Sequence, residues 1–287
     1  MASSTTAQDA PSTAKTLIFD IPTKTLKLQA SRPVPTPDHR KDEHLVRVRT
    51  TALCSGELEW PTLFPAAIFP ENPDKQVTPG YDLAGVVVAS PPGSPFRPGN
   101  AATVPLSAIT AWQALFQHAG VDGLCDSNAK GKTVLVTAAA GGVGVWLIQL
   151  ASLAGLEVIA QIGSAENGKF VTELGASKTV NYKTTSLKKW TEEEGPFDIV
   201  IDLLGRKTIV EPPEGRKPEQ LESKNIKSLF FIMEPNGGQL AEVSKLLDEE
   251  KCKPVLDSVW SLDEYKKAFD RLDGGHARGK VVIKVSE

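Results

Sequence analysis

The chain has 287 residues, of which 40% are hydrophobic, and its 32 basic and 35 acidic residues give a formal net charge of −3. This length exceeds the usual size of one domain and supplies enough apolar residues for two cores. The balanced charge argues against a nucleic-acid or acidic-membrane partner. No apolar run approaches the roughly 20 residues of a membrane-spanning helix. We therefore predict a cytosolic protein that binds small neutral molecules.

The N-terminal residues 1–14 are small, polar and proline-containing, with an aspartate and no arginine. This composition predicts a disordered tail rather than a transit peptide.

The three cysteines, Cys54, Cys125 and Cys252, are too far apart in sequence for a disulfide framework or a four-cysteine zinc site. Cys54 is interpreted as a small buried residue, because a free cysteine usually packs like an apolar side chain. We predict no bound metal.

An apolar stretch, WPTLFPAAIFP at residues 60–70, is interrupted by three prolines. Proline breaks a regular helix, so this stretch is predicted to be a loop. Two interpretations remain open for it. The loop packs beneath its own domain, or Trp60, Phe64 and Phe69 line a pocket for a bulky apolar substrate.

The segment Thr133–Gly144, TVLVTAAAGGVG, predicts a strand followed by a glycine turn, and the apolar pattern after it predicts a helix. Gly141, Gly142 and Gly144 would let the backbone approach a pyrophosphate at the positive end of that helix. The alternative is a turn with a structural role alone.

The next predicted strand, Glu157–Ile162, ends where dinucleotide-binding enzymes select their cofactor. An acidic residue there would bind the adenosine ribose and disfavour a 2′-phosphate. Here Ser164 follows the strand, Lys169 lies one helical turn on, and Tyr182 follows the next predicted strand. These neutral and cationic donors favour NADP(H) over NAD(H). Glu166 lies within reach of the same loop, and an ordinary solvated role for Lys169 is the alternative.

The spacing of hydrophobic residues predicts further strands and helices along the chain. They are a strand at Lys178–Asn181, helices in GQLAEVSKLLDEEK and SLDEYKKAFDRL, and a closing strand in KVVIKV.

Several motifs occur in an order that resembles one family. They are AAAGGVG, SAENGK followed by LGA, PGYDLAGVV at 79–87, ATVPLSAITAWQAL at 102–115, and the terminal HARGKVVIKV. From about residue 15 onward the chain resembles the medium-chain dehydrogenase/reductase superfamily. Within it, the motifs look like the zinc-independent quinone oxidoreductase and enoyl reductase branch, in a fungal-looking form.

The resemblance implies an α/β fold, with a Rossmann doubly wound parallel sheet and a partly β, GroES-like barrel that holds the substrate. The substrate domain would comprise residues 15–106 and 252–287, and the NADP(H)-binding domain residues 107–251. The cleft between the two domains would hold the substrate.

The resemblance also implies roles for individual residues. The pyrophosphate would contact Gly141, Gly142, Val143 and Gly144. The adenosine 2′-phosphate would lie among Ser164, Lys169 and Tyr182, and the nicotinamide near Thr110.

Cys54 resembles the first catalytic zinc ligand of alcohol dehydrogenases, but Tyr81 replaces their partner histidine. The resemblance therefore leaves Cys54, Glu57 and Asp82, which would make a poor metal cluster. Without zinc to polarise a carbonyl, a conjugated acceptor becomes the more plausible substrate. Tyr81 is then the candidate proton donor. The alternatives are that Tyr81 forms a wall of the pocket and that solvent supplies the proton.

The chain departs from the family pattern at two places, because expected segments are missing after Gly99 and after Thr208. The shortening either reflects an incomplete sequence or is genuine.

We predict an NADPH-dependent, zinc-free oxidoreductase that transfers hydride to a quinone or an α,β-unsaturated carbonyl compound, in detoxification or secondary metabolism. The alternative is a non-redox or catalytically reduced member that binds NADPH or an apolar metabolite. Relatives often dimerise through the Rossmann sheet edge, so a homodimer is possible.

Overall fold

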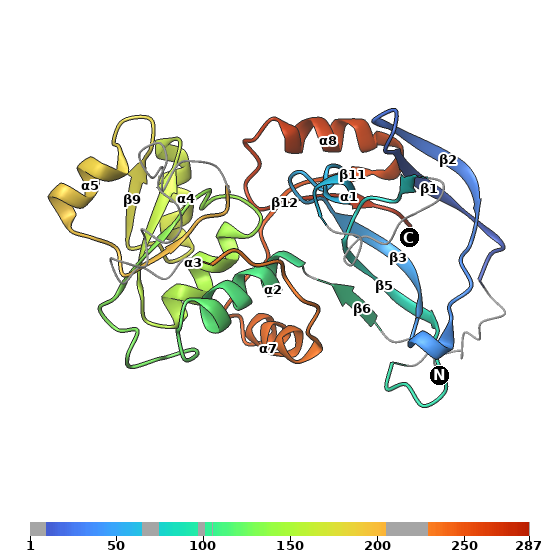
Figure 1. Ribbon diagram of the computed structural model, residues 1–287, viewed down its shortest axis with the longest axis horizontal. Helices are drawn as coiled ribbons and strands as arrows, with labels where there is room; N and C mark the ends of the chain where they lie inside the picture. The colour runs from blue at the N-terminus through green and yellow to red at the C-terminus, as the bar shows by residue number, and fades with distance from the viewer. Residues whose placement is uncertain (1–9, 65–74, 97–100, 105, 205–228, 287) are drawn as a thin grey trace. The chain divides into compact units, whose positions relative to one another are not determined.

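The computed structural model describes residues 10–64, 75–96, 101–104, 106–204 and 229–286. The chain divides into unit 1, residues 1–105 and 256–287, and unit 2, residues 106–255 (Figure 1). Phe69, Gly99 and Thr208 lie outside the described residues.

Unit 1 is rich in β-structure and contains two sheets, with strand orders β2-β1-β4 and β11-β12-β3-β5-β6. Its strands are β1 (Thr13–Asp20), β2 (Thr25–Pro33), β3 (Leu45–Ala52), β4 (Gln76–Val77), β5 (Asp82–Ala89), β6 (Ala101–Val104), β11 (Leu256–Ser261) and β12 (Lys280–Lys284). Its helical segments are η2 (His39–Lys41), α1 (Trp60–Leu63), η4 (Leu262–Glu264) and α8 (Tyr265–Asp273). The closing strand β12 pairs in parallel with β11 and antiparallel with β3. This pairing brings the end of the chain beside its first third.

Unit 2 has a four-stranded parallel sheet with the order β10-β7-β8-β9. Its strands are β7 (Thr133–Val136), β8 (Glu157–Ile162), β9 (Lys178–Asn181) and β10 (Ile199–Ile201). Its helices are α2 (Leu106–Trp112), a π-helical segment η3 (Gln113–His118), α3 (Gly144–Leu153), α4 (Ala165–Glu173), α5 (Leu187–Glu194) and α7 (Gly237–Asp248).

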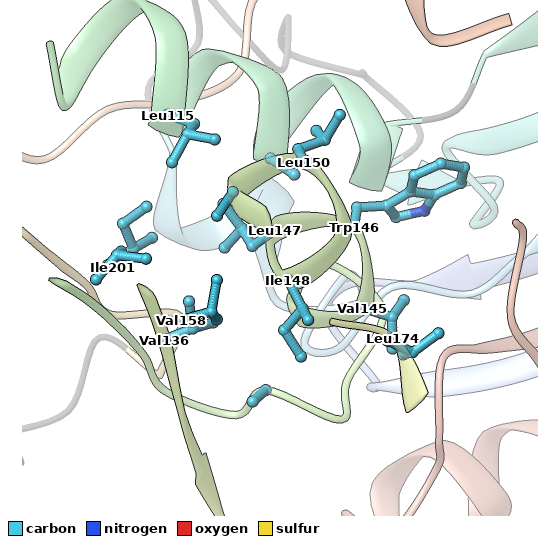
Figure 2. Packing of buried hydrophobic residues seen from close by; sticks show 14 of the residues in the cluster. Leu115, Val136, Val145, Trp146, Leu147, Ile148, Leu150, Val158, Leu174 and Ile201 are labelled. Carbon is cyan, nitrogen blue, oxygen red and sulfur yellow. The ribbon is translucent and has the colours of Figure 1, made fainter. Parts of the chain in front are cut away.

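Both faces of this parallel sheet are covered. Val134 and Val136 of β7 belong to a large apolar cluster with α3 and α4, whereas Leu135 points to the opposite face and packs with residues of α5. Side chains of successive strand residues alternate between faces, which explains this division. Figure 2 shows Leu147 and Ile148 of α3 beside Val136 and Val158 of the sheet. The α/β fold with a covered parallel sheet is as predicted.

Three helices of unit 2 begin with a polar side chain that accepts a hydrogen bond from a backbone N–H of the first turn. The capping residues are Ser164 for α4, Ser186 for α5 and Asn236 for α7. No side chain caps α3 in this way. Backbone carbonyls take this role instead, because the Val145 N–H donates to the Gly141 carbonyl at 3.1 Å and the Leu147 N–H to the Val143 carbonyl at 3.0 Å.

The sequence predicted several elements with the bounds that the structure has, including β8 and β9. The expectation of a disordered tail through residue 14 needs a correction, because β1 begins at Thr13, where it pairs with Pro33 of β2. Among the described residues, no helix is both long and apolar enough to cross a bilayer.

Candidate functional site

The turn between β7 and α3 is anchored to both neighbouring strands. The Thr137 backbone N–H donates to the Ile201 carbonyl at 3.2 Å, and its Oγ1 donates to Asp202 Oδ1 at 2.7 Å. On the other side, the Ala139 N–H donates to the Gln161 carbonyl at 3.4 Å. The turn is therefore held at the carboxyl edge of the sheet, where open parallel sheets bind ligands.

Gly144 is required by this geometry. A Cβ atom there would lie 2.5 Å from the Ala139 oxygen and 2.6 Å from the Ala138 oxygen, so any larger residue must displace the backbone. Ala138 itself adopts a positive φ of 45°. The tight turn places the start of α3, which no side chain caps, at the carboxyl edge of the sheet, and such helix starts bind anions.

The end of β8 brings two of the expected phosphate contacts together. The Tyr182 N–H donates to the Ile162 carbonyl at 3.0 Å. The Tyr182 hydroxyl oxygen packs against Gly163, since a Cβ atom added to Gly163 would lie only 2.5 Å from it. Ser164 caps α4 through its hydroxyl oxygen, which accepts from Asn167 at 3.2 Å. Its hydroxyl hydrogen remains available to donate to a phosphate.

The side chains of Lys169 and Tyr182 are exposed, and Tyr182 is 56% exposed despite its size. Lys169 lies in α4, as expected, and Glu166 lies in the first turn of the same helix. Thr110 lies in α2, where its hydroxyl donates to the Leu106 carbonyl at 2.7 Å. Its oxygen keeps the capacity to accept a hydrogen bond.

A second group of polar residues lies in unit 1, and we call Cys54, Glu57, Asp82 and Lys280 the Lys280 cluster. Asp82 begins β5 and Lys280 begins β12, and both strands pair with β3, just before Cys54. Lys280 Nζ donates to Cys54 Sγ at 3.2 Å and lies 3.3 Å from Asp82 Oδ2. The Lys280 and Asp82 side chains are each only 11% exposed.

Glu57 is the most buried acid of this cluster, with 1% of its surface exposed. Its Oε2 accepts from the Cys54 backbone N–H at 3.2 Å, whereas its buried Oε1 has no hydrogen-bond partner among the described residues. Burial raises the pKa of Glu57 from 4.5 to about 7, although bonds from backbone N–H groups and the Lys280 charge oppose the shift. Burial also raises the pKa of the Cys54 thiol to about 11, so the thiol is neutral at physiological pH.

The ammonium of Lys280 stays charged in this setting. Burial opposes the charged form, but the contacts with Cys54 and Asp82 outweigh it and raise the pKa of Lys280. Cys54 is buried as predicted, and its sulfur in addition accepts a hydrogen bond from the Lys280 ammonium, which the sequence did not indicate.

Tyr81 lies beside this cluster and stacks on Trp60, with ring centroids 5.4 Å apart and an angle of 31° between the planes. Burial, with a smaller contribution from the Glu57 charge, raises the pKa of Tyr81 to about 12. The phenol is therefore protonated across the physiological range and can donate a hydrogen bond.

The stretch after Glu59 begins with the short helix α1 rather than a loop, which corrects the prediction for this part. Pro61 is tolerated because the first-turn N–H groups have no partner within a helix. Phe64 ends the helix and its ring centroid lies 6.3 Å from that of Trp60.

Lys280 was missed as a candidate residue. The sequence places it 226 positions from Cys54, and only the pairing of β12 with β3 joins them. A lysine at the start of an apolar strand gives no local signal of burial. Across the described residues, no group of three or more His, Cys, Asp and Glu side chains is arranged to hold a metal ion.

Comparison with known families finds a match to the family described as zinc-binding dehydrogenase, over residues 174–283. A probable zinc-binding mitochondrial oxidoreductase from Arthroderma benhamiae is 40% identical, and the match covers 96% of this chain and 98% of that protein. That alignment spans 330 positions, more than the 287 residues of this chain. The relative therefore has internal residues without a counterpart here.

Two further proteins extend the comparison. The mitochondrial NAD(P)H oxidoreductase RTN4IP1 of Danio rerio is 29% identical, with 71% of this chain and 61% of that protein covered. The solved structure of a quinone oxidoreductase from Coxiella burnetii has a TM-score of 0.70 and 26% identity, and covers 96% of this chain and 100% of its own. The chain thus belongs to the medium-chain dehydrogenase/reductase superfamily, in its quinone oxidoreductase-like branch of oxidoreductases.

Proposed function

We propose that this protein is an NADPH-dependent reductase that transfers hydride to a quinone or an α,β-unsaturated carbonyl compound without zinc. The preference for NADPH over NADH rests on the end of β8. Ser164 and the exposed Tyr182 lie beside Gly163 there, and the strand does not end in a carboxylate that would repel a 2′-phosphate. Two relatives support this class through their names, a quinone oxidoreductase and an NAD(P)H oxidoreductase.

The cofactor fits the residues present in unit 2. The uncapped start of α3 after Gly141, Gly142 and Val143 offers backbone N–H donors to a pyrophosphate. Ser164, Lys169 and Tyr182 offer a hydroxyl, an ammonium and a phenol to a 2′-phosphate, and Thr110 is the proposed neighbour of the nicotinamide. Bound NADPH supplies the hydride.

Zinc does not fit the Lys280 cluster, although the family description and one relative's name refer to it. An ammonium lies 3.2 Å from the sulfur and 3.3 Å from a carboxylate oxygen. A zinc ion would need those atoms at about 2.3 and 2.0–2.2 Å, in the space that the ammonium takes. We therefore assign no step to zinc.

Tyr81 is proposed to contact the substrate oxygen. Because its pKa is raised to about 12, the phenol holds its proton firmly and acts first as a hydrogen-bond donor to developing negative charge. The stacked Trp60 orients its ring, and together with Phe64 it forms an apolar wall that suits a conjugated substrate.

A second candidate function is NADPH or metabolite binding without turnover. The alignment with the Arthroderma benhamiae relative spans 330 positions, more than the 287 residues of this chain. Segments of that relative therefore have no counterpart here, which favours binding without turnover. A fluorescence titration with NADPH and NADH, followed by a quinone or an enone in the same cuvette, separates the two functions. Preferential NADPH binding with oxidation supports the reductase, whereas tight binding without oxidation supports the second candidate.

Lys169→Ala is expected to raise the Kd for NADPH about 10- to 100-fold, the effect of losing one charged hydrogen bond to phosphate. The Kd for NADH should change little, since NADH lacks the 2′-phosphate. Fluorescence titration of both cofactors measures the difference, with Lys188→Ala as a control that removes an exposed lysine from α5. Equal weakening of both cofactors would remove Lys169 from the phosphate site.

Tyr81→Phe is expected to lower kcat about 10- to 100-fold while leaving the Kd for NADPH unchanged. The substitution removes the donor but keeps the ring that stacks on Trp60. Steady-state rates with a quinone and an enone test this expectation. Unaltered turnover would mean that Tyr81 is part of the pocket wall.

The cytosolic location and the homodimer stay predictions. One relative is named as mitochondrial, so fractionation of cells that express the untagged chain would decide the location. Sedimentation equilibrium would decide the oligomeric state.

A further inference from the structure

The neighbouring strands β7 and β10 are joined by a threonine–aspartate pair at each end. At the amino end, the Thr133 hydroxyl donates to Asp198 Oδ2 at 3.0 Å and accepts from the Asp198 N–H at 3.1 Å. At the carboxyl end, the Thr137 hydroxyl donates to Asp202 Oδ1 at 2.7 Å and accepts from the Leu203 N–H at 2.9 Å. The two pairs therefore hold the same two strands together at opposite edges of the sheet.

Of these two pairs, the one at the carboxyl end, Thr137 and Asp202, lies next to the glycine turn. Thr137 is fully buried and directly precedes Ala138, which has a φ of 45°. A residue other than glycine keeps such a φ only where its surroundings hold it. The Ala138 carbonyl accepts from the Gly141 N–H at 2.9 Å and lies 2.6 Å from the place of a Cβ on Gly144. Direct contacts thus lead from Thr137 through Ala138 to the start of α3.

We propose that Thr137 and Asp202 are a positioning pair, whose hydrogen bond sets the glycine turn so that the backbone at the start of α3 faces the cofactor pyrophosphate. This inference rests on the proposed function, because it requires that NADPH binds at the turn. Neither side chain has to touch the cofactor, since a hydrogen bond to phosphate weakens steeply when its donor is misaligned.

The role of each side chain in the pair follows from its hydrogen bonds. The Thr137 hydroxyl accepts from the Leu203 N–H, so its single hydrogen is given to Asp202. The same carboxylate oxygen of Asp202 also accepts from the Leu204 N–H at 3.0 Å. Asp202 therefore serves the turn as an acceptor, a role that a neutral amide oxygen can also fill.

The test measures the Kd for NADPH by fluorescence and the Kd for adenosine 2′-monophosphate by calorimetry, with the tag-free full chain and its variants. Thr137→Val keeps the shape of the side chain and removes the hydroxyl. Its Kd for NADPH should rise about 10-fold, the effect of one misaligned charged hydrogen bond. Its Kd for adenosine 2′-monophosphate should not change, because this probe has no pyrophosphate. Thr137→Ser and Asp202→Asn keep the donor and the acceptor, so both should bind NADPH like the unsubstituted chain.

Thr133→Val is the matched control, because it removes the same kind of bond between the same two strands at the opposite edge. Both valine variants should lower the Tm, but Thr137→Val alone should weaken NADPH binding. Equal weakening by the two variants would mean that Thr137 serves strand pairing only and would overturn the inference. Folded Thr137→Val that binds NADPH like the unsubstituted chain would overturn it as well.

Asp202→Ala decides the question if Thr137→Val does not fold, since Asp202 is exposed and its loss leaves the core intact. This variant deprives the Thr137 hydroxyl of its acceptor and should also raise the Kd for NADPH about 10-fold, whereas an unchanged Kd would overturn the inference. An unsubstituted chain that does not bind NADPH would overturn both the inference and the proposed cofactor site. One that binds NADPH but reduces no quinone or enone would overturn the reductase activity alone.

Discussion

Gly144→Ala is expected to raise the Kd for NADPH by more than about 100-fold, because at least two charged hydrogen bonds from the start of α3 would be misplaced. The new Cβ would lie 2.5 Å from the Ala139 oxygen and 2.6 Å from the Ala138 oxygen. The Ala139 N–H donates to the Gln161 carbonyl of β8, and the Ala138 oxygen accepts from the Gly141 N–H. Both residues are held in place, so the start of α3 must move instead. Overpacking of this kind also costs about 1–3 kcal/mol of stability.

Fluorescence titration with NADPH and a thermal melt measure the two effects. Gly237→Ala is the matched control, because a Cβ at this first residue of α7 would meet nothing within 4 Å. It should leave both quantities near those of the unsubstituted chain. If Gly144→Ala bound NADPH as tightly as the unsubstituted chain, the turn would not be the pyrophosphate site.

Glu57→Gln is expected to remove a pH dependence of stability that amounts to roughly 3 kcal/mol. In the folded state burial raises the pKa of Glu57 from 4.5 to about 7. Between these two values the folded chain holds a proton that the unfolded chain has released. The stability from this group is therefore fully present below pH 4.5 and is lost as the pH rises to 7.

Urea unfolding at a series of pH values measures the difference in unfolding free energy between the two proteins. The unsubstituted chain should lose stability relative to Glu57→Gln as the pH rises through this window, while Lys280, whose pKa is raised, keeps its charge throughout. Glu59→Gln, a change at an exposed neighbour that lies 3.7 Å from Lys24, controls for the lost surface charge. Parallel pH profiles for Glu57→Gln and the unsubstituted chain would show that Glu57 ionises normally.

Local patterns were sufficient for the elements that carry the proposed cofactor site. The β-branched run before the glycines predicted β7, the helical spacing after them predicted α3, and β8 and β9 have the predicted bounds. These predictions succeeded because strand and helix periodicity is a property of neighbouring residues. The start of β1 was missed because its pairing with β2 sets it. The short helix α1 was missed because it tolerates a proline in its first turn.

The sequence by itself determined the family, the parallel α/β unit and the glycine turn, since each depends on residues close together in the chain. Only the tertiary structure decided the nature of the cluster at Cys54. Its cation comes from Lys280, which β12 brings to the end of β3 through antiparallel pairing. Burial then sets the protonation of Glu57, Cys54 and Tyr81, and burial depends on which distant strands pack together rather than on the neighbouring residues.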